Sequence, residues 1–266
     1  MRLNAVTLSA IGILAWTMSA SAQQGGDLSA LFNSGLGGTV SHADSVPLSQ
    51  TISQIADGQG WKSTIVLANT GTADAPFTLK FWKGDGSALT LPLGADGNVS
   101  QITGTIPKNG SRILVTDGAS SSLSQGWGEL TTPNPIGGTT IFRQRIPNQP
   151  DSEASTPVTA AVAKRLLLPF DNTQGFAMGV ALVNADSTKG TTVHATCYDE
   201  AGNNLGASDI TLATHGQTAF LLSGTVPASA NKRGVVEFSS ADTIITGLGL
   251  RFSPNATFTS VEMLTP

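Results

Sequence analysis

The chain has 266 residues, of which 12% are charged, and its formal net charge is −4 at pH 7. This balance disfavours a nucleic-acid-binding protein, because phosphate backbones are recognised by clusters of lysine and arginine, and the 14 basic residues form no such cluster in the sequence. The single cysteine, Cys197, cannot form a disulfide within the chain. Any folded domain must therefore be stabilised by its hydrophobic core.

The N-terminal segment 1–22 has the three parts of a secretory signal peptide. Arg2 gives a short positive start, an apolar run follows over residues 5–18, and Ala-Ser-Ala at 20–22 has the pattern that signal peptidase cleaves. The apolar run is shorter than the roughly 20 residues needed to span a bilayer. We therefore predict an exported protein, periplasmic or extracellular, with no membrane span after cleavage. An uncleaved anchor is the alternative.

The next segment, 23–46, is rich in small residues and predicts a flexible N-terminal stretch. After it the chain contains an internal repeat: the segment 60–69 (GWKSTIVLAN) recurs as 175–184 (GFAMGVALVN). The period of roughly one hundred residues is too long for solenoid or propeller repeats and matches a duplicated domain. We predict one domain over residues 47–158 and a second over residues 164–266.

Alternation of apolar and polar residues between turns predicts β-strands in both copies. In residues 77–82, Phe81 falls on the buried face and Trp82 on the outer face. The equivalent segment 193–198 places Cys197 at the position of Phe81, which predicts a core thiol rather than a reactive one. Because Asn-Gly, Asp-Gly and Gly-Gly turns punctuate these runs, we predict an all-β fold of two tandem immunoglobulin-like antiparallel β-sandwiches.

A charged pair recurs in the two copies: Glu129 and Arg143 correspond to Glu237 and Arg251. If the strands that carry the first pair form a hairpin centred near Ile136, the two side chains lie opposite each other, and the same holds in the second copy. We predict structural cross-strand ion pairs. A binding role for either arginine is the alternative.

The aromatic residues offer the candidate recognition surface. Alternation sends Trp82 and Trp127 outward, and exposed aromatic rings stack on sugars or anchor protein partners. Trp61 falls on the same face of its strand as Ile65 and Leu67, and the equivalent residue in the repeat is Phe176. We therefore expect Trp61 in the core. Trp82 could instead simply cover the end of a hairpin.

Familiar catalytic templates are missing from the sequence, including His-Glu-x-x-His, Gly-x-Ser-x-Gly and the phosphate-binding loop. Asp57 and Asp171 are copies of each other that precede Gly-bearing turns, where aspartate commonly caps backbone. The acidic loops at 96–98 and 199–203 could contact calcium, which is the alternative to a site without metal, but neither has the spacing of a recognised calcium loop. We predict a protein that is not an enzyme and has no catalytic residue, metal or cofactor.

The segments 61–71, 168–172 and 233–238 resemble secreted bacterial proteins built from duplicated immunoglobulin-like units. This resemblance covers nearly all of the mature chain, and the family has no assigned activity. It implies a fold and transfers no catalytic residue.

From these observations we expect a non-enzymatic secreted or cell-surface binding or structural protein, of the adhesion or extracellular-matrix type. Its partner would be a protein or a polysaccharide at the cell surface. One alternative is a carbohydrate-binding module, which requires Trp82 or Trp127 to be exposed. Another is a periplasmic assembly chaperone of the two-sandwich type, which requires an open edge strand and a basic residue in the interdomain cleft.

Overall fold

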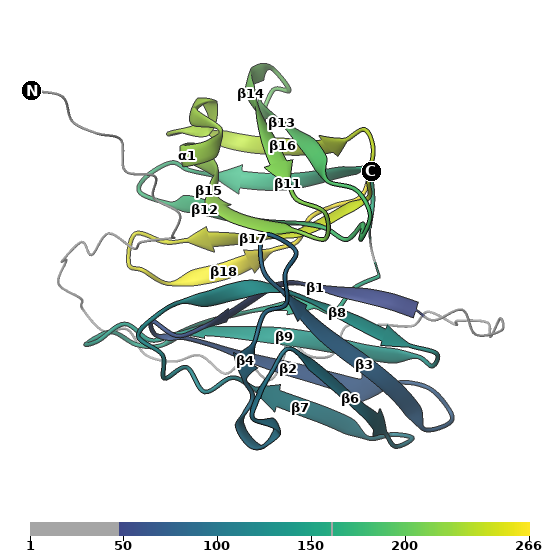
Figure 1. The fold of residues 1–266 in the computed structure, drawn as a ribbon. Coiled ribbons are helices and arrows are strands. Elements are labelled where there is room, and N and C mark those ends of the chain that lie inside the picture. The colour runs from purple at the N-terminus through teal and green to yellow at the C-terminus, as the bar shows by residue number, and fades with distance from the viewer. Residues whose placement is uncertain (1–47, 161) are drawn as a thin grey trace, which may run out of the picture. The chain divides into compact units, whose positions relative to one another are not determined.

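A computed structural model describes residues 48–160 and 162–266, whose regular structure is mainly β-strand (Figure 1). The predicted signal peptide and the predicted flexible segment 23–46 lie outside the described residues. The α-helix in the described ranges is a single turn, α1 (Leu222–Thr225). None of the helices there is long and apolar enough to cross a bilayer. The prediction of an all-β fold is confirmed.

The first half of the fold contains two four-stranded antiparallel sheets, which we call the β1 sheet and the β2 sheet. The β1 sheet has the order β1-β8-β3-β6 and consists of β1 (Leu48–Asp57), β8 (Ser124–Thr132), β3 (Ala75–Trp82) and β6 (Gln101–Ile106). The β2 sheet has the order β10-β9-β2-β7 and consists of β10 (Ser152–Pro157), β9 (Ile136–Gln144), β2 (Trp61–Asn69) and β7 (Ser111–Val115).

The second half repeats this plan in the β11 sheet and the β12 sheet. The β11 sheet has the order β11-β16-β13-β14 and consists of β11 (Arg165–Asp171), β16 (Arg233–Ser240), β13 (Thr191–Asp199) and β14 (Asn204–Leu212). The β12 sheet has the order β15-β12-β17-β18 and consists of β15 (Gln217–Leu221), β12 (Ala177–Asn184), β17 (Ile245–Phe252) and β18 (Phe258–Val261).

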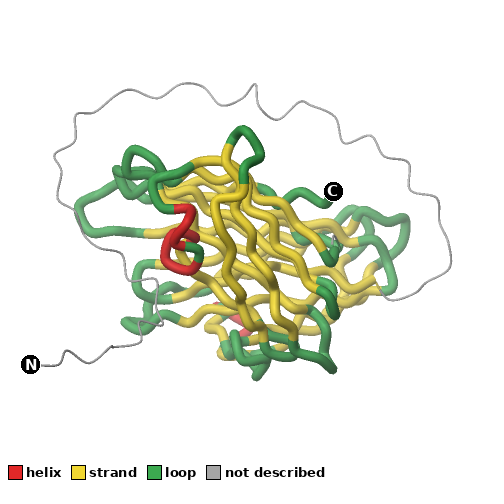
Figure 2. Tube along the Cα trace, turned by 90° about the horizontal axis from the view of Figure 1, so that it is seen from above, coloured by secondary structure: helices red, strands yellow, loops and turns green. Residues whose placement is uncertain are grey.

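The two halves therefore match strand for strand. The first half adds a two-stranded pair, β4 (Leu91–Pro92) with β5 (Asn98–Val99), and the short helix η2 (Gly94–Asp96) between β3 and β6. The second half adds α1 and the short helix η3 (Pro227–Ser229) between β15 and β16. Seen from above, the loops gather at the ends of the strands (Figure 2).

The strand order shows where the chain crosses between the two sheets of each half. Consecutive strands β8 and β9 lie in opposite sheets, and so do β16 and β17. The last two strands of each half, β9 with β10 and β17 with β18, are neighbours in one sheet, as strands F and G of immunoglobulin domains are. The sandwich class is as predicted, but the connection between β8 and β9 crosses from one sheet to the other.

Each sandwich has its own core, built from the inward side chains of its two sheets. In β2 and β3 buried residues alternate strictly with more exposed ones, as period-two strands require. Fully buried core residues from both sheets include Ile65, Leu79 and Leu130 in the first half and Leu182, Val193 and Phe238 in the second.

Strand β12 breaks this alternation, because it is buried along almost its whole length. One face of the strand lines the core of the second sandwich, and the other is covered by the first half of the chain. Contacts of this kind join residues 47–266 into one compact unit.

Candidate functional site between the two sandwiches

An apolar cluster joins the two halves, and we call it the seam. Ala56, Trp61 and Phe142 come from the first half. Their partners from the second half are Ala181, Leu248 and Phe258. The rings of Trp61 and Phe258 lie 5.3 Å apart between centroids. Trp61 is buried as predicted, but it is buried between the sandwiches rather than inside one of them.

The sequence indicates the seam through the second copy of the repeat, whose strand lacks the polar outer face that the first copy has. Segment 61–69 reads WKSTIVLAN and has Lys62 and Thr64 on its outer face, whereas its copy 176–184 reads FAMGVALVN and is apolar on both faces up to the terminal Asn184. A strand that is apolar on both faces is typical of burial on both sides. This difference between the copies indicates which sheet is covered.

Trp82 and Trp127 lie opposite each other in the register of β3 and β8, on the outer face of the β1 sheet. The prediction that they form an exposed recognition surface is wrong for Trp127, which is fully buried, while Trp82 is partly buried. The loop between β14 and β15 of the second half covers them. The His215 ring centroid lies 4.3 Å from that of Trp82 and 4.7 Å from that of Trp127. Alternation predicted the outward direction correctly but could not show what covers the face.

His215, from the second half, packs against side chains of the first half. Trp127 Nε1 donates a hydrogen bond to the His215 carbonyl oxygen at 3.2 Å. The His215 Nε2 atom lies 3.6 Å from a Glu129 carboxylate oxygen, which is too long for a hydrogen bond. Burial lowers the pKa of His215; Lys80 adds to the lowering, whereas the carboxylates of Glu129 and Asp186 oppose it. The imidazole is therefore neutral at pH 7 and packs as an aromatic group.

The predicted ion pair between Glu129 and Arg143 is wrong. The two residues lie on β8 and β9, which belong to opposite sheets, so the hairpin that the pairing required does not form. Arg143 instead lies 3.5 Å from Asp151, and Glu129 faces His215 of the other half.

The predicted pair in the second copy is wrong for the same reason. Glu237 accepts a hydrogen bond from Arg165 of β11 at 2.7 Å. Arg251 donates one to Asp171 at 2.8 Å, and its guanidinium carbon lies 3.5 Å from the ring centroid of Phe176. These partners give Arg251 a structural role at the end of the sandwich.

The repeated aspartates hold loops, as predicted. Asp57 accepts a hydrogen bond from the Gly118 backbone nitrogen at 2.8 Å. Asp171 accepts hydrogen bonds from the Thr173 hydroxyl and backbone nitrogen at 2.6 and 3.0 Å. The Thr173 hydroxyl and then Arg251 lower the pKa of Asp171 to about 2. The carboxylate is therefore a fixed negative charge rather than a proton donor at neutral pH.

Other groups with catalytic chemistry are also held in structural positions. Cys197 is fully buried in β13, and burial raises the pKa of its thiol to about 11, so the predicted core thiol is confirmed. His194 contacts Asp209 at 2.6 Å across β13 and β14 on the exposed face. Asp96 accepts two hydrogen bonds from Arg112, at 2.5 and 2.7 Å.

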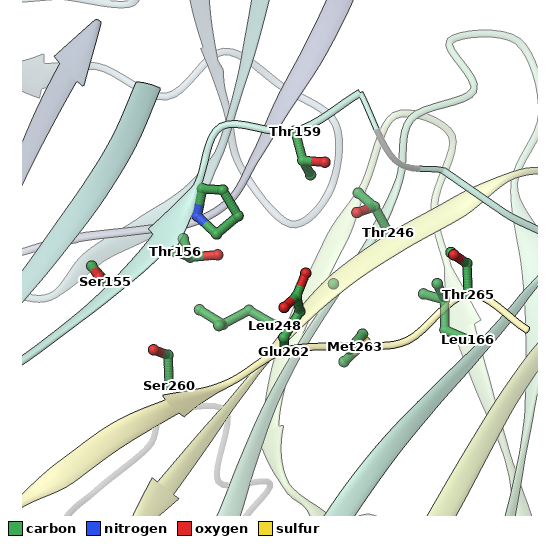
Figure 3. A pocket seen from close by; sticks show the side chains of 12 residues that line it. Ser155, Thr156, Thr159, Leu166, Thr246, Leu248, Ser260, Glu262, Met263 and Thr265 are labelled. Carbon is green, nitrogen blue, oxygen red and sulfur yellow. The ribbon is translucent and has the colours of Figure 1, made fainter. Parts of the chain in front are cut away.

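A pocket of about 360 Å³ opens beside the seam, between β10 of the first half and β17 and β18 of the second (Figure 3). Strands β10 and β18 are edge strands of their sheets. The pocket lies where the last residues of β10 face the segment after β18. Its lining residues are Ser155, Thr156, Pro157, Thr159, Leu166, Thr246, Gly247, Leu248, Ser260, Glu262, Met263 and Thr265.

The polar part of this pocket consists of hydroxyl groups, which can donate or accept hydrogen bonds, around one negative charge. Six of the lining side chains carry a hydroxyl group, and Glu262 is the one charged residue among them. Figure 3 shows Glu262 beside Leu248 and Met263, which belong to the apolar part of the wall together with Pro157 and Leu166. Within the described part of the chain, no basic side chain lies within ion-pair distance of Glu262. The site can therefore receive a compact donor-rich or cationic group.

Sequence reasoning missed the pocket, because both halves build it. A side chain at position 247 would meet Met263 Sδ at 2.8 Å, so Gly247 allows the segment after β18 to pass close to β17. Glu262, an isolated charge near the end of the chain, was the one available signal.

No family model, curated protein or solved structure matches the chain. The class of protein is thus defined by its own fold: two β-sandwiches of one strand plan, joined by an apolar seam with a hydroxyl-lined pocket beside it.

Proposed function

We propose that this is a non-enzymatic binding or structural protein of the cell surface or extracellular matrix, exported by its N-terminal signal. The observation that carries the proposal is the pocket built jointly by the two halves. In support, the side chains with catalytic potential described above, such as Cys197, His215 and Asp171, are packed in a core, against the other half or in loop hydrogen bonds. The joined sandwiches then act as a scaffold that presents the pocket to a partner.

The lining favours a partner group with a protonated amine. The Glu262 carboxylate supplies the charge, and the surrounding hydroxyls can accept hydrogen bonds. The volume of about 360 Å³ is near the lower end of ligand pockets, which suits a single side chain or a small terminal group. Such amines are presented by proteins and by amino sugars at cell surfaces.

Two observations weigh against the alternative functions. A carbohydrate-binding module would require an exposed Trp82 or Trp127 to stack on a sugar ring, but Trp127 is fully buried and Trp82 is partly buried, with the His215 ring 4.3 Å from its own. The one charged residue of the pocket between the halves is acidic, whereas a chaperone that holds a subunit's terminal carboxylate needs a basic residue there.

The test is co-sedimentation of residues 23–266 with whole cell envelopes, before and after chemical acetylation of the envelope amines. We expect saturable retention that acetylation removes, and that Glu262→Gln weakens by roughly tenfold or more because it removes the charge. Glu153→Gln is the matched control, since Glu153 is exposed on β10 and does not line the pocket. Retention that is equal for both variants, or no retention by the wild-type protein, contradicts the proposal.

A further inference from the structure

Strand β6 leaves one edge of the β1 sheet open. Among the described strands it pairs with β3 alone, and its register runs without a bulge from Ala75 opposite Ile106 to Lys80 opposite Gln101. The strand contains no charged residue and no proline, and Gln101 and 103–105 are exposed. An exposed, straight and uncharged edge is a template for pairing with another strand.

The equivalent edge of the second half is protected. Strand β14 carries Asp209 opposite His194, at the place where β6 has Thr103 opposite Thr78. Its register is shifted by a bulge, and η3 covers the strand near Gly206, where an added side chain would meet Ala228 at 2.8 Å. Edge charges, bulges and covering elements are the usual protection against strand addition. The two copies of one strand therefore differ in whether their edge is protected.

The sequence of β6 identifies the strand that fits this edge. Residues 102–106 read Ile-Thr-Gly-Thr-Ile, which is the same in both directions. When two copies of this strand run antiparallel about a two-fold axis at Gly104, Ile102 lies opposite Ile106 of the second copy, and Thr103 lies opposite Thr105. The buried isoleucines then face buried isoleucines, and the exposed threonines face exposed threonines.

We propose that the protein forms a symmetric dimer with a second copy of itself, in which the two β6 strands pair and the two β1 sheets become one continuous sheet. A two-fold interface of this kind uses the same patch on both subunits and closes on itself. The pairing opposes no like charges, and threonine pairs across antiparallel strands are favourable. The open edge of β6 and its palindromic sequence form this interface, and the pocket beside the seam takes no part in it.

Sedimentation velocity of residues 23–266 tests the proposal. We expect a concentration-dependent dimer for the wild-type protein. The double substitution Thr103→Lys/Thr105→Lys places lysine opposite lysine twice, and we expect it to weaken the dimer by roughly tenfold or more. Thr103→Lys/Thr105→Glu places opposite charges across the axis, and we expect it to restore the dimer. Thr211→Lys is the matched control, since Thr211 has the position of Thr105 on β14.

Three outcomes overturn the proposal. The first is a wild-type protein that stays monomeric up to about 100 µM. The second is a dimer that the double lysine substitution leaves unchanged. The third is a loss of dimer that the Thr103→Lys/Thr105→Glu variant does not reverse while its urea midpoint equals that of the wild-type protein.

Discussion

His215 shows how a single side chain links the two halves. Its ring lies against Trp82 and Trp127, and burial lowers its pKa. Below the ordinary histidine pKa of about 6.5 the unfolded chain binds a proton more readily than the folded one, so stability rises with pH and falls on acidification. We therefore predict that the wild-type protein has a lower urea midpoint at about pH 5 than at about pH 7.5.

The substitution His215→Asn tests this assignment. Position 215 has a φ of 55°, which asparagine tolerates, and the hydrogen bond from Trp127 goes to the backbone carbonyl and is kept. We expect the variant to be less stable at neutral pH and to lose most of the difference between the two pH values. His194→Asn, which removes an exposed histidine, serves as the control. An equal loss of pH dependence in both variants would show that His215 is not its source.

Equivalent asparagines, Asn69 and Asn184, stabilise the same strand end in the two copies. Asn69, at the end of β2, donates to the carbonyls of Ala73 and Ile106 at 2.7 and 2.9 Å. Asn184, at the end of β12, donates to the carbonyls of Lys189 and Ala213 at 2.8 and 3.0 Å. These bonds tie the end of the strand to the loops around it.

We predict that Asn69→Ala and Asn184→Ala each lower the free energy of unfolding by about 2–4 kcal/mol, because each leaves two carbonyls without their donor. Urea unfolding measures the change. Asn255→Ala changes an exposed asparagine and should stay within about 0.5 kcal/mol of the wild-type protein. A change of similar size in all three variants would contradict the assignment.

Elements were easier to predict from the sequence than their pairing. The expected strands at 77–82 and 193–198 lie within β3 and β13, because period-two alternation reports directly on which side chains are buried. The partner of β8 could not be predicted in the same way. Alternation does not report which strands pair. The segment between Glu129 and Arg143, which we assumed to be a hairpin, therefore proved to be a connection between opposite sheets. The pocket was missed for a related reason, since its two walls are about one hundred residues apart in the chain.

For the molecule as a whole, the seam makes the stability of each half depend on the other. Trp61 and Phe142 of the first half and Leu248 and Phe258 of the second belong to one buried apolar cluster. Unfolding either half alone would expose this apolar surface on the half that remains. We predict one cooperative unfolding transition for the described unit, rather than one for each sandwich.

The chain provides a separate probe for each half. Outside the predicted signal peptide its tryptophans are Trp61, Trp82 and Trp127, all in the first half, while the buried thiol of Cys197 lies in the second. Asn184→Ala weakens only the second half, yet we expect it to lower the urea midpoint of tryptophan fluorescence and that of thiol labelling by the same amount. A fluorescence midpoint that stays at its wild-type value while the thiol midpoint falls would show that the sandwiches unfold independently, and that the seam is a contact between two stable domains.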